Sequence, residues 1–124
     1  MQILTAAAAA LLALAGCSDV ANKPAIDALE YAYITALQDA PGSKKCLTPK
    51  QLDGRWFTLC GINTGGPQLG YAGLWELRTD GSTWAAYAAN GKAMAVQGKL
   101  TNPQLKPAEA PLTYDTAKAR ALFD

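Results

Sequence analysis

The residues best suited to chemistry in this sequence are its three cysteines, Cys17, Cys46 and Cys60. A cysteine thiol can act as a nucleophile, carry a lipid or pair with a second thiol. The 124 residues contain no histidine, which excludes Ser-His-Asp triads, Cys-His pairs and histidine-ligated zinc. We therefore expect no catalytic residue, no metal site and no cofactor.

Three further patterns fall short of a catalytic motif. The glycine-rich stretch 65–73 lacks the Lys and Ser or Thr that complete a phosphate loop, so we interpret it as a flexible connection between strands. Glu76 has no second acid placed near it, and we expect it to pair with Arg78 or to remain solvated. Ser43 and Lys44 lie in a polar stretch, where a lysine lacks the burial that a Ser-Lys dyad needs.

Cys17 ends an apolar segment of fourteen residues, 3–16, in which only Thr5 is polar. A membrane span needs about 20 residues, so this length instead fits the hydrophobic region of a signal peptide. The segment closes with Leu14-Ala15-Gly16-Cys17, which resembles the lipobox of bacterial lipoproteins at all four positions. The alternative is a buried helix with small residues packed against a core.

The lipobox resemblance implies a location as well as a modification. It implies that residues 1–16 are cleaved, that Cys17 carries diacylglycerol and often a further acyl chain, and that residues 17–22 form a tether to the lipid bilayer. Stable anchoring takes two or more such chains. In lipoproteins an Asp after the cysteine favours the inner membrane. Ser18 stands there, so we expect the outer membrane, with the folded part facing the periplasm.

Cys46 and Cys60 remain as an even pair once Cys17 is assigned to lipid. A bond between them would close a fifteen-residue loop, for which loop-closure entropy predicts about 3 kcal/mol of stabilisation. Disulfides persist in the oxidising periplasm. We predict this disulfide, with two buried free thiols or a redox pair as alternatives.

Composition places the whole chain among folded, non-nucleic-acid-binding proteins. Half of the residues are hydrophobic, 17% are charged, and the net charge is +1. A nucleic-acid-binding protein needs a clear basic excess, so we expect no nucleic-acid partner. The length allows one small domain, which we place at residues 23–100, followed by a Pro-rich linker and short helix at 101–124.

Hydrophobic spacing predicts an α+β fold. Spacings of three and four predict a helix over 23–40, followed by a polar loop over 43–54. Strands are predicted at 55–62, 71–79, 83–89 and 92–100, with two-residue turns at Asp80-Gly81 and Asn90-Gly91. The prediction is an N-terminal helix packed on a four-stranded antiparallel meander, with a short C-terminal helix that Thr113 or Asp115 caps.

The predicted turns also set a register. They place Leu77 opposite Trp84 and Glu76 opposite Ala85, and they collect Trp75, Leu77 and Trp84 on one face. The other face collects a second apolar set, namely Leu74, Tyr87, Met94 and Val96. The N-terminal helix can cover only one face, so the other must meet the C-terminal segment, a partner or the membrane.

These observations lead to a prediction of function. We expect Trp75, Leu77 and Trp84 to bind a protein partner, with core packing as the alternative, because tryptophan is enriched where binding energy concentrates. We expect a non-enzymatic envelope lipoprotein that docks on another envelope protein. The alternative is a blocking lipoprotein, an inhibitor, immunity or exclusion factor against a lytic enzyme, a phage or a conjugation apparatus. An enzyme or small-ligand carrier is disfavoured.

Overall fold

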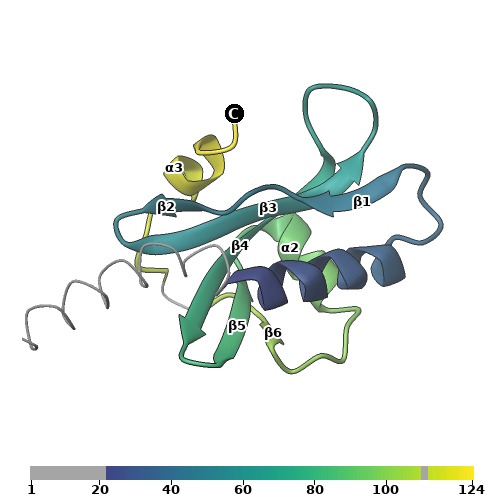
Figure 1. The fold of residues 1–124 in the computed structure, drawn as a ribbon. Helices are drawn as coiled ribbons and strands as arrows, with labels where there is room; N and C mark the ends of the chain where they lie inside the picture. Colours follow the sequence, from purple (N-terminus) through teal and green to yellow (C-terminus); the bar gives the residue numbers. More distant parts are fainter. Residues whose placement is uncertain (1–21, 110–111) are drawn as a thin grey trace, which may run out of the picture.

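A computed structural model describes residues 22–109 and 112–124. In this part of the chain a six-stranded sheet lies between an N-terminal helix, helical over 22–36, and a short C-terminal helix on the other face (Figure 1). The α+β class is confirmed. The elements after the first helix are β1 (Ser43–Cys46), β2 (Lys50–Leu52), β3 (Arg55–Asn63), β4 (Gly70–Asp80), β5 (Thr83–Ala88), α2 (Gly91–Gln97), β6 (Leu105–Lys106) and α3 (Thr116–Ala121).

The sheet is mixed, so the predicted four-stranded antiparallel meander is wrong in its strand number and in its type. The strand order is β1-β3-β4-β5-β6, with β2 also paired to β3. All of these pairs are antiparallel except β5 with β6, which is parallel. The strands predicted at 55–62, 71–79 and 83–89 are confirmed as β3, β4 and β5.

The predicted fourth strand is instead helix α2. Asn90 caps this helix, because its side-chain Oδ1 accepts hydrogen bonds from the backbone N–H groups of Ala93, at 2.9 Å, and Leu74, at 3.1 Å. Asn-Gly is as suitable for starting a helix as for a hairpin turn. Ala93 and Val96 are buried three residues apart while Met94 is exposed, which is a helical pattern.

Three strands occur where a loop and a linker are predicted, namely β1 and β2 in the loop over 43–54 and β6 in the linker. β1 lies at the edge of the sheet, where its two lysines suit a strand that must not pair with another chain. β6 lies within the Pro-rich segment, where Leu105 is buried and pairs with Ala86 of β5. Leu105 and Lys106 therefore belong to the sheet rather than to a linker.

The β4–β5 hairpin turns one residue later than predicted. Asp80 pairs with Thr83, which leaves Gly81 and Ser82 as the loop, and Gly81 takes the positive φ of +62°. Leu77 consequently lies opposite Ala86 instead of Trp84. Glu76 lies opposite Tyr87 instead of Ala85, because every partner moves by two positions.

A shift of two positions leaves each side chain of β4 and β5 on its predicted face. One face packs against the N-terminal helix, which contributes four residues to the apolar core, Ala25, Leu29, Ala32 and Tyr33. Val96, predicted on the other face, instead packs from α2 into the cluster around Trp75 on this first face, because its segment is a helix. The second face carries Phe57, Leu59 and Leu74, packed beneath Ala119 of α3 and the partly buried Tyr114, Leu122 and Phe123. The chain itself therefore covers much of both faces, and the C-terminal segment docks on the second.

Gly73 of β4 permits the close approach of the N-terminal helix. A Cβ at this position would collide with the Tyr33 hydroxyl and with the backbone of Ala93. The helix, β4 and α2 therefore meet at a point that accepts only glycine without rearrangement.

Candidate functional site

The predicted partner-binding residues lie beneath the N-terminal helix. Trp75 is 0% exposed and Leu77 is 3% exposed, and Trp84 packs partly buried beside them. The three residues do share one face, as predicted. That face is not available as a docking surface in this structure, because the helix covers it. The alternative of core packing describes their position.

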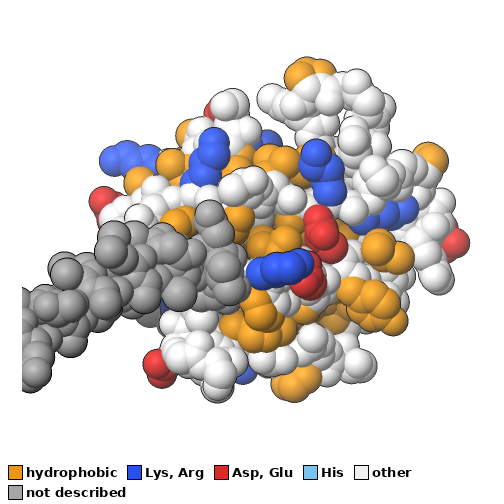
Figure 2. Space-filling view, viewed as in Figure 1, with side chains coloured by type: hydrophobic (Ala, Val, Ile, Leu, Met, Phe, Trp, Pro, Cys, Tyr) orange, Lys and Arg blue, Asp and Glu red, His pale blue; other side chains and the backbone are white. Residues whose placement is uncertain are grey.

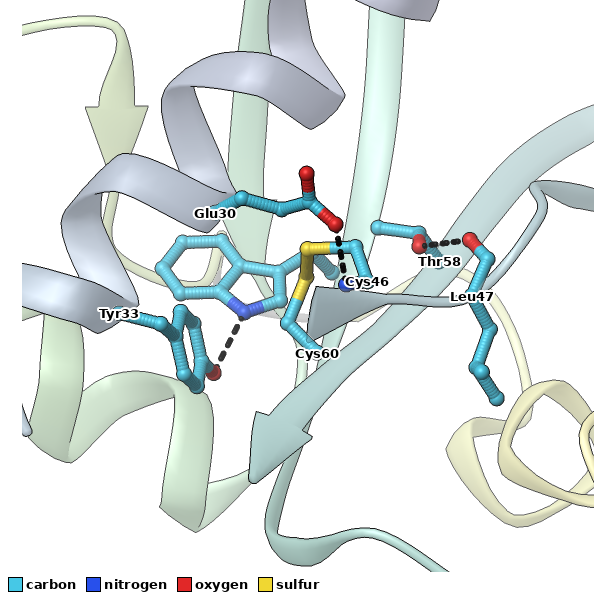
Figure 3. Close-up of a disulfide and its surroundings, with 7 residues drawn as sticks. Glu30, Tyr33, Cys46, Leu47, Thr58 and Cys60 are labelled. Carbon is cyan, nitrogen blue, oxygen red and sulfur yellow. Dashed lines mark hydrogen bonds between the residues drawn. A yellow bond between two sulfur atoms is a disulfide. The ribbon is translucent and has the colours of Figure 1, made fainter. Parts of the chain in front are cut away.

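Cys46 and Cys60 are joined by a disulfide in the structure, as predicted (Figure 3). The two residues are direct cross-strand neighbours on β1 and β3, with their Cα atoms 4.0 Å apart. Glu30 of the N-terminal helix accepts a hydrogen bond from the Cys46 backbone N–H at 2.9 Å. Helix, edge strand and central strand are thus tied together at one place.

Trp75 is held by a partner that the sequence did not indicate. Its indole Nε1–H donates to the Tyr33 hydroxyl at 2.9 Å, and the two rings meet edge to face with centroids 6.4 Å apart (Figure 3). Burial raises the pKa of Tyr33 to about 12, against the smaller opposing effect of the Trp75 hydrogen bond. This polar pair is satisfied and lies in the dry interior, so it serves the fold.

Glu76 lies on the second face, between two arginines. Its carboxylate accepts from Arg55 at 3.0 Å and from Arg78 at 2.9 Å, so the predicted Glu76–Arg78 pair is confirmed. Arg78 also pairs with Glu109 from the C-terminal segment, and Arg55 donates to the Thr113 hydroxyl at 2.5 Å. The hydrogen bond from Arg78 lowers the pKa of Glu109.

This charged cluster is a clasp that holds Glu109, Thr113 and Tyr114. The Arg78 guanidinium lies 4.2 Å from the centre of the Tyr87 ring, and Arg55 lies 5.3 Å from that of Tyr114. Burial raises the pKa of Tyr114, and the negative charge of Glu76 adds to this. The cavity beside the cluster measures about 10 Å³, room for about one water molecule. The clasp therefore fixes the C-terminal residues that it contacts. The cavity beside it is too small for a substrate.

A larger cavity of about 210 Å³ opens between the β3–β4 loop and α3. Both walls rise from the same side of β3 (Figure 1), and the loop projects from the body of the molecule (Figure 2). Its lining is mostly polar, from Lys45, Asn63, Gln68 and Arg120, with Gly66 and Pro67 between them, and the apolar part comes from Leu47, Leu59, Leu69 and Phe123. We call this the loop–α3 cavity.

Local contacts hold both walls of the loop–α3 cavity. The Asn63 side chain accepts from the Gly65 N–H at 3.0 Å, and Gly65 takes a φ of +88°, which bends the loop outward. On the other wall the Lys50 ammonium donates to the Leu122 carbonyl at 2.9 Å and lies 5.7 Å from the Phe123 ring centre. These contacts keep the cavity open between two anchored segments.

The loop–α3 cavity has almost no local signal in the sequence. Its lining comes from β1, the β3–β4 loop and α3, which are far apart in the chain. The available signal is the glycine-rich stretch 65–73, which by itself indicates only a flexible connection between strands.

The remaining predicted sites lie elsewhere. Cys17 and the tether lie outside the described residues. Within residues 22–109 and 112–124 no cluster of three or more His, Cys, Asp or Glu side chains is placed to hold a metal ion. Among the helices of this same part of the chain, none has the length and apolarity to cross a membrane.

Comparison of the chain with known protein families, with curated proteins and with solved structures gave no match, so the site is interpreted from its own geometry.

Proposed function

We propose that the chain is a lipid-anchored protein of the bacterial envelope, which docks without catalysis on another envelope protein. The observation that carries this proposal is Cys17 at the end of the apolar segment, only five positions before the first described helical residue, Asn22. A lipidated cysteine there would hold the folded part close to the bilayer.

The tether sets which end of the fold faces the lipid. Five extended residues span at most about 18 Å. The side chain of Asn22, buried at 3% exposure, accepts a hydrogen bond from the Thr79 hydroxyl at 3.2 Å, so the tether meets the body beside the β4–β5 hairpin. We call this the anchor end of the domain.

The loop–α3 cavity lies at the other end. β4 runs from Gly70, at the base of the β3–β4 loop, to Asp80 at the anchor end. Eleven strand residues rise by about 33 Å. An anchored domain would therefore point the β3–β4 loop away from the bilayer that holds its lipid and toward other proteins in the periplasm. We propose this end as the docking surface in place of the buried tryptophan face.

Anchoring is tested by mass spectrometry of the mature protein and by fractionation of Cys17→Ser. The proposal expects an acylated N-terminal Cys17 peptide in the membrane fraction, and soluble protein or uncleaved precursor for Cys17→Ser. Ser18→Ala is the matched control and should stay in the membrane fraction. A membrane-bound mature protein that begins at Met1 would overturn the proposal.

A further inference from the structure

The size of the loop–α3 cavity limits its ligand. Sites for drug-sized molecules and cofactors measure about 300–1,000 Å³. At about 210 Å³ this cavity accepts a group the size of one amino-acid side chain with part of its backbone.

The lining fixes the chemistry of that group. Leu59 and Leu69 belong to the apolar cluster of the second face, so the floor of the cavity is continuous with the core. Lys45 and Arg120 supply two positive charges, and no acidic residue is among the residues that line the cavity. Asp124 approaches Arg120 at 3.2 Å from outside the lining, and 65% of its side chain is exposed. The fitting ligand is an apolar group beside a carboxylate.

Polar groups at the rim favour a peptide over an acyl chain. The Asn63 and Gln68 side chains and the exposed loop backbone of 64–68 offer donors and acceptors that match a peptide backbone. A fatty acid would need an apolar surface along its whole chain, whereas the exposed lining of this cavity is mostly polar.

We infer that the loop–α3 cavity binds a short acidic peptide segment of a partner protein, with one apolar side chain against the partly exposed Leu69 and Phe123, above the buried Leu59, and the neighbouring carboxylate paired with Lys45 and Arg120. The inference rests on the proposed docking function. Its test uses the purified full chain away from membranes, so anchoring and peptide binding can fail independently.

The first test is a titration of the full chain, with leucine methyl groups labelled for NMR. The probe is acetyl-Leu-Glu-amide, with acetyl-Leu-Gln-amide, acetyl-Ala-Glu-amide and octanoate as comparisons. We expect saturable shifts of the Leu59 and Leu69 methyls with acetyl-Leu-Glu-amide. Affinity should fall about three- to fivefold when the carboxylate is replaced by an amide, the effect of one part-exposed ion pair. It should also fall when leucine becomes alanine.

The second test changes the two cations. Lys45→Gln and Arg120→Gln should each weaken acetyl-Leu-Glu-amide about three- to fivefold and leave acetyl-Leu-Gln-amide unchanged. Lys118→Gln is the matched control, because it removes the same charge from α3 at a position that does not line the cavity. Absence of saturable shifts, equal affinity for the two leucine peptides or an equal loss in the control would overturn the inference. Octanoate binding as tightly as acetyl-Leu-Glu-amide would contradict a peptide ligand.

Discussion

The two faces of the sheet are covered in different ways. The N-terminal helix contributes four residues to the apolar core over Trp75 and the disulfide. The C-terminal segment contributes one, Ala119, together with partly buried side chains and the charged clasp around Glu76. Hollows of about 340 and 200 Å³ lie along the sides of the N-terminal helix, while its buried residues seal Trp75 beneath it. The second face leaves the loop–α3 cavity open beside its cover, with two cations in the lining. The difference assigns stability mainly to the first face and places recognition, as proposed, on the second.

Trp75→Ala should have the largest effect on stability. Truncation of a fully buried tryptophan costs about 3–5 kcal/mol, because it removes apolar contact and leaves a cavity. Trp84→Ala on the same face should cost clearly less, since Trp84 is only partly buried. Denaturant unfolding of both variants measures this. A Trp75→Ala protein with unchanged stability would show that the first face is not the core.

Removal of the disulfide should have the second-largest effect on stability. Replacement of both Cys46 and Cys60 by alanine should lower the free energy of unfolding by about 3 kcal/mol, as expected for a fifteen-residue loop. Thermal unfolding of the variant is compared with that of the unaltered protein with and without reductant. If reductant leaves the unaltered protein's midpoint unchanged, the bond does not contribute as proposed.

Tyr33 should make the first face sensitive to high pH. Its pKa is raised to about 12 in the folded state from 10, so its contribution is fully present below pH 10 and is lost as pH rises through 12. Two pKa units correspond to about 2–3 kcal/mol. Tyr33→Phe should lose this pH dependence, at a cost of about 1–3 kcal/mol near neutral pH for the unpaired Trp75 N–H. If the free energy of unfolding of Tyr33→Phe falls between pH 10 and 12 as steeply as that of the unaltered protein, Tyr33 is not the source of the pH dependence.

Leu122→Ala tests the weaker cover and should have the smallest effect. Leu122 ends α3 and is only partly buried against the second face, so we expect a loss of about 1 kcal/mol. Leu29→Ala, on the N-terminal helix, is the matched change and should cost about 2–5 kcal/mol, because Leu29 is fully buried. Equal losses at the two positions would remove the distinction between the covers.

Hydrophobic spacing predicted the elements with strong patterns and missed those decided by long-range contacts. β3, β4 and β5 are rich in aromatic and branched residues, so their positions were predictable. β1 carries two lysines and no apolar residue before Cys46, and only its pairing with β3 makes it a strand. The side chain of Asn90 decided between a turn and a helix through a bond to Leu74, which is distant in sequence.

The site was less predictable than the fold. The disulfide followed from counting cysteines, and the Glu76–Arg78 pair followed from strand periodicity. Which face the N-terminal helix covers did not follow, because both faces are apolar in sequence. The close approach at Gly73 and the bond from Trp75 to Tyr33 hold the helix on the tryptophan face, and neither has a local signal.

The most direct test of the proposed docking surface is photo-crosslinking from two positions in intact envelopes. A photoreactive residue replaces Gln68, which lines the loop–α3 cavity, or Ser82, in the exposed turn at the anchor end. We expect the photoreactive residue at position 68 to crosslink to one discrete protein and the one at position 82 to give no adduct. Lys45→Gln should reduce the adduct at position 68, and Lys118→Gln should leave it unchanged. The same adduct at equal yield from position 82, or an adduct at position 68 that Lys45→Gln leaves unchanged, would contradict the proposed docking surface.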